Sequence, residues 1–199
     1  MKKQSIALIT GNKHKLAIAR RAFREQRLDA RFTLKQVALD VPELQDVDTR
    51  TVSEFSARLA FQQLGTPLLK SDAGVYIDAL RGFPGPFLRH MNHWLTADDL
   101  LRLMCGKKNR SAVFVDTLTY VNARGMATTF TAKLHGRIAE KVQGSFETMI
   151  NTLFIPLGHT KTLAAMTRKE LLGFWVDTRW QQLAQHLRKQ STVGQPKRT

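Results

Sequence analysis

Short apolar runs alternate along this chain with amphipathic stretches, and turn-forming residues separate most of them. An apolar run at 5–9 ends at the sequence TGN (10–12), and apolar positions then recur at helical spacing to about residue 27. This pattern predicts a strand, a tight turn and a helix. Imperfect alternation over 32–39 predicts a second strand, which is followed by an acidic loop at 42–48.

A second helix is expected after the acidic loop. Ser53 belongs to a residue type that caps helix N-termini, and Gly65 marks the expected C-terminal end. Between them, Phe55, Leu59 and Ala60 recur at a spacing that places them on one inward face. The pattern therefore predicts a helix with one buried face.

The middle of the chain combines strand-like runs with strong turn signals. Two short strands are expected at 68–70 and 75–79, on either side of a sharp turn at 71–74. Glycine and proline concentrate at 82–86, which predicts a loop of fixed backbone shape. Thr96 is then expected to cap a helix that runs to about residue 105.

The second half of the chain predicts a β-hairpin and two closing helices. Residues 112–121 and 126–134 are rich in Val, Thr, Phe and Tyr, and the residues between them are typical of a hairpin loop. The closing helices are expected at 167–172 and 177–187. Because strands and helices intermix without a Ser- or Pro-rich linker, we expect one α/β domain with a mixed sheet over residues 1–189. The polar segment 190–199 predicts a disordered tail.

The composition is that of a folded globular protein, with 43% hydrophobic and 24% charged residues among 199. The single cysteine, Cys105, excludes an intrachain disulfide and is expected to be a buried small hydrophobe. No stretch reaches the ~20 apolar residues of a membrane span, and the first apolar run is too short for a secretory signal. These features predict a cytoplasmic protein without a membrane partner.

The charge of the chain is unusual, because 31 basic residues face 16 acidic ones and give a formal net charge of +15. Residues 1–40 carry 10 basic and 3 acidic side chains, residues 41–100 carry 5 and 8, and residues 101–199 carry 16 and 5. Two basic flanks therefore enclose an acidic middle. This distribution favours a polyanionic partner, which leaves nucleic acid, a nucleotide or a phosphorylated metabolite open.

The turn at 10–12 is a candidate anion site. It joins an expected strand to an expected helix, where backbone N–H groups and the helix dipole favour negative charge. Lys13 and Lys15 add cations nearby. The pattern favours phosphate binding, although turns of this kind occur in many α/β folds.

Two acidic residues stand where apolar strands are expected to end. Glu43 follows Pro42, and Asp72 follows Ser71. Carboxylates in such positions can jointly hold Mg²⁺, which prefers oxygen ligands, and one of them can activate a water molecule. The alternative for Asp72 is a structural role, in which its side chain caps the turn.

Other side chains with functional chemistry favour structural roles. Trp94, Trp175 and Trp180 are expected in the core, as large aromatics at helical spacing usually are. His90 and His93 have an i, i+3 spacing that metal ligands also use. No third ligand stands at a diagnostic distance, so packing or solvated histidines are expected.

Taken together, several blocks resemble the inosine triphosphate pyrophosphatase family over nearly the whole chain, from about Ile6 to Leu187. The family pattern T-G-N-x-x-K is matched at 10–15 and G-x-P-G at 82–85. The blocks that carry the resemblance are TGNKHK (10–15), PELQ (42–45), SDAGVYIDALRGFPGP (71–86), RSAVF (110–114), HGRI (135–138) and FIPLGHTKTLAAMT (154–167). Members of this family hydrolyse deaminated purine nucleoside triphosphates to the monophosphate and pyrophosphate.

The resemblance implies a fold, a reaction and a set of site residues. The fold is a twisted mixed sheet flanked by helices, with a cleft between two lobes, and the family commonly forms homodimers. Glu43 and Asp72 would bind Mg²⁺, and Asp72 would activate the attacking water with Lys15 beside it. The residues that would bind the nucleoside triphosphate are Thr10, Gly11, Asn12, Lys13, Lys15, Arg58, Ala73, Thr148, Asn151, Thr178 and Arg179.

The chain departs from the family pattern at several positions. Ser71 stands where a second acid is usual, Ala73 replaces a Ser or Thr, and Arg58 replaces a lysine that faces the phosphates. Residues 148–152 align with the base-binding block F-G-aromatic-D-P, whose stacking aromatics and aspartate are missing. Other departures are Gly173 in place of a lysine, and Asp177 and Thr178 in place of the first two residues of the base-reading S-H-R, whose arginine is retained as Arg179.

These departures leave alternative functions open. The expected function is a Mg²⁺-dependent nucleoside triphosphate pyrophosphohydrolase with a changed base preference, because the phosphate end is mostly preserved while the base end is rewritten. The alternative is a family relative that has lost catalysis and binds nucleotides. A nucleic-acid-binding role, suggested by the net charge, is a further alternative.

Overall fold

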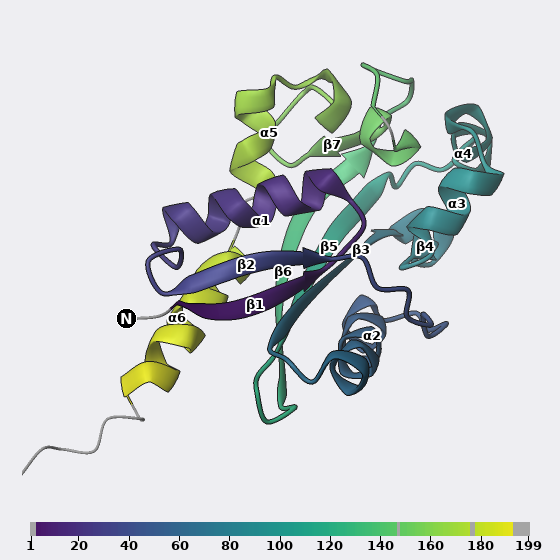
Figure 1. The fold of residues 1–199 in the computed structure, drawn as a ribbon. Coiled ribbons are helices and arrows are strands. Elements are labelled where there is room, and N and C mark those ends of the chain that lie inside the picture. Colours follow the sequence, from purple (N-terminus) through teal and green to yellow (C-terminus); the bar gives the residue numbers. More distant parts are fainter. Residues whose placement is uncertain (1–2, 147, 176–177, 193–199) are drawn as a thin grey trace, which may run out of the picture.

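The structure, a computed structural model, describes residues 3–146, 148–175 and 178–192 of the chain. Its centre is a seven-stranded sheet in the order β2-β1-β3-β5-β6-β7, with β4 paired to β3 (Figure 1). The strands are β1 (Gln4–Ile9), β2 (Phe32–Val37), β3 (Leu68–Ile77), β4 (Pro84–Gly85), β5 (Ser111–Val121), β6 (Ala127–Ile138) and β7 (Phe154–Pro156). The α-helices are α1 (Lys13–Glu25), α2 (Thr49–Leu64), α3 (Leu88–Trp94), α4 (Ala97–Leu103), α5 (Arg168–Trp175) and α6 (Thr178–Thr192).

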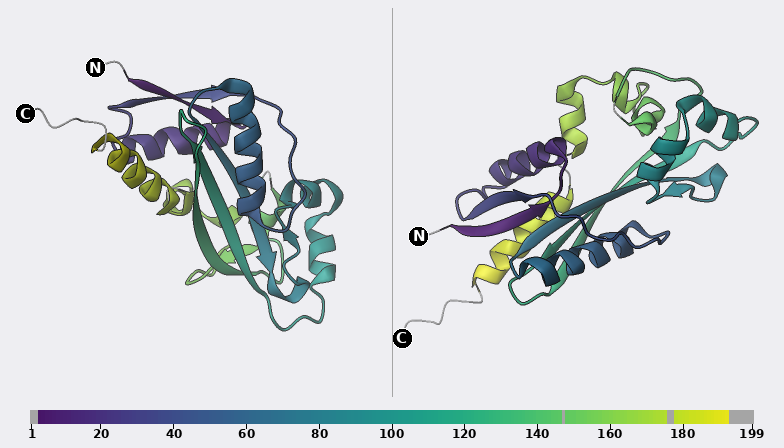
Figure 2. Two further views of the ribbon diagram at one scale, coloured as in Figure 1. Left: turned by 90° about the horizontal axis from the view of Figure 1, so that it is seen from below. Right: turned by 45° about the vertical axis from the view of Figure 1, so that its right-hand side comes forward.

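The sheet is mixed, as the sequence predicts. Strand β1 pairs in parallel with β2 and β3, whereas β3, β5, β6 and β7 pair successively in antiparallel fashion. Helices cover both faces of the twisted sheet, with α1 on one side and α2 on the other (Figure 2). The predicted α/β fold is therefore confirmed.

Two apolar clusters hold the helices against opposite faces of the first half of the sheet. Helices α1 and α6 meet through an edge-to-face contact between Phe23 and Trp180, and this cluster also contains Leu69 of β3. On the other face, Ala57 of α2 packs in a cluster with Leu68. Neighbouring residues of β3 thus serve opposite faces, as expected for a strand that is buried on both sides.

A third apolar cluster forms the core of a second lobe. It joins the far ends of β3, β5 and β6 to α3, α4 and the 3-10 helices η2 (Met149–Thr152) and η3 (Leu163–Ala165). Met91 of α3, Phe114 of β5 and Ile150 of η2 all belong to it. In Figure 2, α3 and α4 lie at the end of the sheet remote from β2 and α6. The cleft described below lies between this lobe and α1.

Helix α2 begins one turn before the position predicted from Ser53. Its N-cap is Asp48, whose side chain accepts hydrogen bonds from the backbone N–H groups of Arg50 and Thr51. Ser53 lies inside the helix, where its buried hydroxyl pairs with Thr119 of β5 at 2.9 Å. The predicted cap is therefore wrong. Asp48, at the end of the acidic loop, belongs to an equally good class of capping residues and starts the helix earlier in the chain. Phe55, predicted to be inward, is 38% exposed.

The predicted turn at 71–74 is also wrong, because β3 runs without interruption from Leu68 to Ile77. All ten residues pair with β5, in a register that places Asp72 opposite Thr117. This long pairing overrides the local turn preference of the Ser-Asp-Ala-Gly sequence. Asp72 therefore stands on a strand, and the structural role expected for it as a turn cap does not arise.

Other local predictions are closer to the structure. The hairpin of β5 and β6 is confirmed, and Thr96 caps α4 in a reciprocal capping box with Asp99. Helix α3 is not predicted by the sequence pattern. It lacks a signal because its N-cap, Phe87, makes no side-chain capping bond.

The expected burial of single residues is confirmed only in part. Trp180 is buried, whereas Trp94 is 72% exposed and Cys105 is exposed, so the core positions predicted for the latter two are wrong. Trp94 is the last residue of α3, and Cys105 follows the end of α4. Both helices are short and keep one face at the surface of the second lobe. The side chain of Trp175 and residues 193–199 of the predicted tail lie outside the described residues, and α6 extends to Thr192. No described helix is both long and apolar enough to span a membrane.

Candidate active site

A cleft of about 1320 Å³ opens where β1 ends and α1 begins. One wall is the turn from Thr10 to Lys15, and another is the acidic loop from Leu39 to Asp46. The floor comes from residues 70–73 of β3, and the far end comes from α3 and η2. Five segments that are distant in the sequence thus converge on one site.

The floor of the cleft is a stretch of β3 whose outer edge lacks a partner strand. Strand β1 pairs with β3 only as far as Ile9 and Lys70, and β4 pairs with it only from Val75. Within the described sheet, this leaves 71–74 open on that edge while β5 holds the opposite edge. The sheet therefore presents Asp72 to the cleft on a rigid strand.

Asp72 is partly buried, and burial is the main cause that raises the pKa of its carboxyl group. Its Oδ1 accepts a hydrogen bond from the backbone N–H of Ala73 at 2.8 Å, which opposes the rise in pKa. The charge of Glu43 adds to the rise, whereas Lys15 and Lys70 oppose it. Asp72 is thus within electrostatic reach of one carboxylate and two ammonium groups.

Lys15 reaches from the first turn of α1 to the floor of the cleft. Its Nζ donates to the backbone carbonyl of Ser71 at 3.4 Å. Burial lowers the pKa of Lys15, and the neighbouring charge of Lys70 acts in the same direction, while Asp72 opposes both. The structure therefore brings Lys15 near Asp72, the other residue predicted to be catalytic.

The turn at 10–15 is arranged differently from the simple anion site that the sequence suggests. The Oδ1 of Asn12 caps α1 by accepting hydrogen bonds from the N–H groups of His14 at 2.7 Å and Lys15 at 3.2 Å. The N–H of Asn12 itself donates to Thr10 Oγ1 at 3.0 Å. The backbone N–H groups of Asn12, His14 and Lys15 are therefore already engaged within the turn. The side chains of Lys13 and Lys15 supply the positive charge of this wall.

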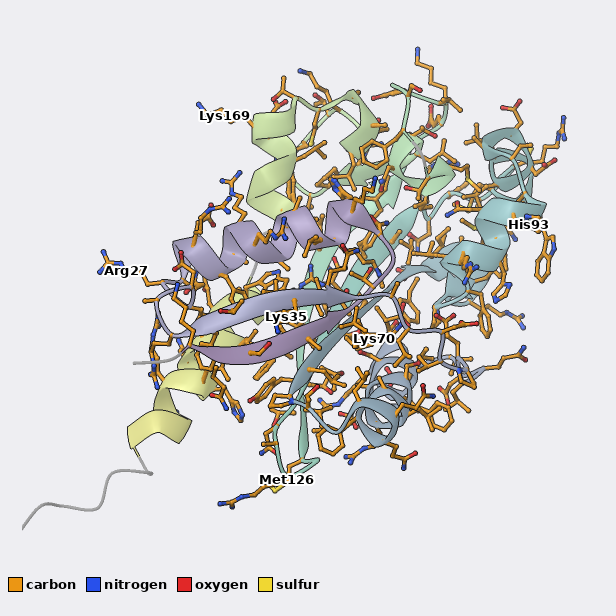
Figure 3. The ribbon with its side chains drawn as sticks, viewed as in Figure 1. Arg27, Lys35, Lys70, His93, Met126 and Lys169 are labelled. Carbon is orange, nitrogen blue, oxygen red and sulfur yellow. The ribbon has the colours of Figure 1, made fainter. Side chains whose placement is uncertain are left out.

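Lys70 is a site residue that the sequence analysis missed. It lies on β3 two residues before Asp72, at the level where β1 ends, and it lines the cleft (Figure 3). Side chains two apart on a strand share a face. Lys70 could therefore be placed beside Asp72 from the sequence only by predicting 68–77 as one continuous strand, and the sequence pattern predicts a turn at 71–74 instead. Its charge lies close enough to lower the pKa values of Asp72 and Lys15.

The structure gathers most of the predicted site residues at the cleft. Those that line it are Thr10, Gly11, Asn12, Lys13, Lys15, Glu43, Asp72, Ala73 and Thr148. The predicted substrate-binding residues that are not part of its lining are Arg58, Asn151, Thr178 and Arg179. Arg58 is exposed on α2, Asn151 is buried in η2 and Thr178 is exposed at the start of α6.

Arg179 is not part of the cleft lining and forms a nearly buried ion pair. Its Nη1 is 3.1 Å from Oδ1 of Asp116, a residue of β5 that stands opposite Ala73. Both charges act on the pKa of Lys15, in opposite directions. The pair therefore belongs to the electrostatic surroundings of the site. Nothing in the sequence around Asp116 signals this partnership, because it depends on the packing of α6 against β5.

The donor set fits one hard divalent cation held jointly with a phosphate ligand. Among the described residues, no group of three or more His, Cys, Asp or Glu side chains converges as a complete metal site. Glu43 and Asp72 do line the same cleft, and Glu43 affects the pKa of Asp72. Mg²⁺ is commonly held by one or two carboxylates together with substrate phosphates and waters, so two carboxylates suffice.

The motifs that build this cleft also match a known family of proteins. The model of the Ham1 family matches residues 6–172, which is most of the chain. The chain belongs to the Ham1 family. The relationship stated from the sequence blocks is thereby confirmed, and the turn at 10–15, Glu43 and Asp72 all fall within the matched region.

Individual Ham1 relatives and structures support this assignment. The dITP/XTP pyrophosphatase of Methanopyrus kandleri is 34% identical over 137 residues, which cover 69% of this chain and 73% of that protein. The dITP/XTP pyrophosphatase of Thermococcus kodakarensis is 30% identical over 165 residues, covering 83% and 86%. The structure of a HAM1 protein from Coxiella burnetii superposes with a TM-score of 0.79 at 22% identity, covering 94% and 99%, and confirms the fold.

Proposed function

We propose that this Ham1-family chain hydrolyses nucleoside triphosphates to the monophosphate and pyrophosphate. The observation that carries the proposal is the meeting of Asp72 and Glu43 with Lys15 and Lys70 in one cleft. A triphosphate carries about four negative charges, so its hydrolysis requires cations at the phosphates and a base for the water. Relatives named dITP/XTP pyrophosphatases support this reaction.

The phosphate chain would lie between the turn at 10–15 and the floor of the cleft. Lys13 and Lys15 line this part of the cleft, and Lys70 faces it from β3. The N-terminal end of α1 adds the partial positive charge of its helix dipole. Because Lys15 is tied to the backbone of Ser71, its ammonium group is held in place before substrate binds.

Asp72 and Glu43 would hold Mg²⁺, which when bound supplies positive charge to the phosphate oxygens. Asp72 would accept a proton from the water whose oxygen attacks the α-phosphorus. The new bond joins that oxygen to the α-phosphorus, the bond to the bridging oxygen breaks, and pyrophosphate leaves with the electron pair. The hydrogen bond from Ala73 occupies Oδ1 of Asp72 and so fixes the orientation of the carboxylate.

The proposal is tested by pyrophosphate release from a panel of ordinary and deaminated nucleoside triphosphates, with and without Mg²⁺. Asp72→Asn should lower kcat by about 10²- to 10⁴-fold, the usual contribution of a positioned base. Asp98→Asn is the matched control, because Asp98 is an exposed carboxylate on α4 outside the cleft lining. It should leave kcat unchanged.

Two results would contradict the proposal. One is the absence of pyrophosphate from every triphosphate at all Mg²⁺ concentrations. The other is equal activity of the Asp72→Asn variant and the unmodified chain. If nucleotides bind without turnover and Asp72→Asn leaves their affinity unchanged, the chain instead acts as a nucleotide-binding relative.

A further inference from the structure

Basic side chains gather at the C-terminal end of α1, remote from the cleft. Helix α1 begins at the cleft, and its 13 residues carry the chain about 20 Å away from it. In Figure 1 this end lies at the left, beside the N-terminal strand. Glu25 is the one acid of α1, and it is paired with Arg21, so that Asp29 is the acid left in the following turn. We call this surface the basic end, and its exposed cations are Arg20, Arg24, Arg27, Arg31, Arg188 and Lys189.

Contacts between three elements hold these cations on one surface. Helices α1 and α6 pack together through the edge-to-face aromatic contact described above. At the end of α6, Nη2 of Arg188 donates to the backbone carbonyl of Gln26, the C-cap of α1, at 2.6 Å. The guanidinium carbon of Arg31 lies 5.7 Å from the ring centroid of Phe32, the first residue of β2. The ends of α1 and α6 and the start of β2 therefore share the basic end.

Arg27 has a backbone conformation that favours glycine. Its φ is 53°, in the left-handed region. Its N–H donates to the carbonyl of Arg24 at 3.0 Å, and the N–H of Leu28 donates to the carbonyl of Phe23 at 2.7 Å. These two bonds form a Schellman motif, in which glycine usually occupies the position of Arg27. An arginine there costs folding free energy that glycine would avoid.

The side chain of Arg27 does not recover this cost through packing. It is exposed and projects away from the molecule at the end of α1 (Figure 3). Within the described part of the chain, it forms no ion pair, and the same holds for Arg20 and Arg24. A residue kept in an unfavourable backbone conformation points to a role outside folding. For an exposed guanidinium, that role is contact with an anion.

The surroundings of these arginines indicate which polyanion fits. The large exposed apolar side chains of the described chain lie between residues 47 and 157, outside α1, the turn after it and α6. Helices that bind membrane surfaces insert such side chains into the lipid, and proteins that bind single strands stack bases on exposed aromatics. A purely cationic surface instead matches the phosphate backbone of a double helix.

The exposed ridge of α1 favours DNA over duplex RNA. Arg20 and Arg24 are four residues apart and therefore share one face of the helix, and Arg27 follows directly after its end. The major groove of B-form DNA is about 12 Å wide and admits an α-helix between two rows of phosphates. The major groove of A-form RNA is deep and narrow and does not.

We propose that the basic end binds double-stranded DNA through its phosphates, without reading the base sequence. This activity goes beyond the proposed function, because none of the residues involved lines the cleft. The chain would then hold a nucleoside triphosphate and a DNA duplex at separate places, at the two ends of α1.

The test is fluorescence anisotropy of a labelled DNA duplex of about 20 base pairs and mixed sequence, measured between about 50 and 200 mM salt. The unmodified chain should bind at the lowest salt, and the logarithm of its affinity should fall linearly with the logarithm of the salt concentration. The combined Arg20→Gln, Arg24→Gln and Arg27→Gln variant should weaken binding at about 50 mM salt by tenfold or more and reduce the salt slope by about three.

The matched control removes the same charge from the second lobe. Lys107 and Lys108 follow α4, Lys141 follows β6, and all three are exposed. The combined Lys107→Gln, Lys108→Gln and Lys141→Gln variant should keep most of the DNA affinity and the salt slope. Thermal unfolding followed by circular dichroism checks that both variants are folded, independently of any pyrophosphatase activity.

Arg27 provides a second test, in which binding and stability change in opposite directions. Arg27→Gly should raise the melting temperature, because glycine adopts the left-handed conformation without strain, and it should weaken DNA binding several-fold. Arg27→Lys keeps the charge and should retain most of the affinity. A lower melting temperature of Arg27→Gly with unchanged DNA affinity would show that Arg27 is merely structural and would overturn its role.

The remaining outcomes also decide the proposal. Absence of duplex binding at about 50 mM salt overturns it, and so do equal losses of affinity in the two triple variants. Tighter binding to duplex RNA or to a single strand of the same sequence overturns the choice of double-stranded DNA. Binding to vesicles of phosphatidylcholine and phosphatidylserine that exceeds binding to DNA identifies a membrane surface as the partner and overturns the proposal.

Discussion

Lys70 changes the charge of the cleft floor, where Ser71 has replaced an expected acid. It shares a strand face with Asp72 and lies within reach of Lys15. We expect Lys70 to contact the phosphate chain directly, because it supplies positive charge that needs no bound metal. Lys70→Ala should lower kcat/KM for a nucleoside triphosphate by about 10- to 100-fold, and Lys70→Arg should restore part of the loss. Steady-state kinetics at saturating Mg²⁺ measures both.

The control for this prediction is Lys35→Ala. Lys35 is an exposed lysine of β2 outside the cleft lining, and its removal changes the net charge of the chain by the same amount. If Lys70→Ala and Lys35→Ala have equal effects on kcat/KM, Lys70 acts only through the overall charge, and direct contact with the phosphates is excluded.

Asp72 should make the stability of the metal-free chain depend on pH. Burial raises the pKa of its carboxyl group above the ordinary value of 3.8, so the folded chain binds a proton more tightly than the unfolded chain. The free energy of unfolding then falls as the pH rises from the ordinary pKa through the raised one. Asp72→Asn removes this fall, so its melting temperature in chelator at about pH 7 should exceed that of the unmodified chain.

Thermal unfolding at several pH values measures the difference. The variant and the unmodified chain should converge toward acidic pH, where Asp72 is protonated and resembles asparagine. A gap between their melting temperatures that is constant with pH contradicts the assigned burial of the Asp72 charge.

At the scale of elements, Gly74 of β3 allows α2 and β4 to approach this strand closely. A Cβ at this position would lie 2.7 Å from Thr49 Oγ1 of α2 and 2.9 Å from the carbonyl oxygen of Gly85 in β4. The carbonyl belongs to the backbone and cannot move aside cheaply. Gly74→Ala should therefore destabilise the fold by about 1–3 kcal/mol, the usual cost of overpacking, and shift Asp72 on the same strand. Denaturant unfolding and pyrophosphate release measure the two effects.

A matched glycine on α5 controls for the substitution itself. A Cβ on Gly173 would meet no atom within 4 Å, and its helical position favours alanine by up to about 1 kcal/mol. Gly173→Ala should be neutral or stabilising. Equal stability of Gly74→Ala and the unmodified chain would show that β4 does not pack against β3 as described.

The sequence predicts those elements that carry their own local signals. The strand, turn and helix around 10–12 could be predicted because an apolar run, a capping Asn12 and helical spacing follow one another directly. The hairpin of β5 and β6 and the capping box of α4 are local in the same way. Continuous β3 could not be predicted, because its course over 71–74 depends on pairing with the distant β5.

The candidate site follows the same division. Motif blocks identify Lys15, Glu43 and Asp72, which all line the cleft. Lys70 stands just outside the motif blocks, and its position at the cleft follows from the pairing of β3 with β5. Sequence patterns therefore reveal the phosphate end of the cleft more fully than its base end.

At the scale of the whole molecule, the net charge of +15 should steer anionic substrates toward the cleft. Salt screens such attraction over a Debye length of about 10 Å at 0.1 M. Raising the salt concentration from about 20 to 200 mM should therefore lower kcat/KM for a triphosphate several-fold, while kcat stays nearly constant. Initial rates over a range of salt and substrate concentrations measure both constants. A fall in kcat alone contradicts steering.

The central claim is that the cleft around Asp72 directs water to the α-phosphorus of a nucleoside triphosphate. The most direct measurement is hydrolysis in water labelled with heavy oxygen, with mass spectrometry of both products. We predict that the label appears in the nucleoside monophosphate, that pyrophosphate is unlabelled, and that both products fall by the same factor, about 10²- to 10⁴-fold, in Asp72→Asn. Label in pyrophosphate, or release of orthophosphate in its place, would contradict the account.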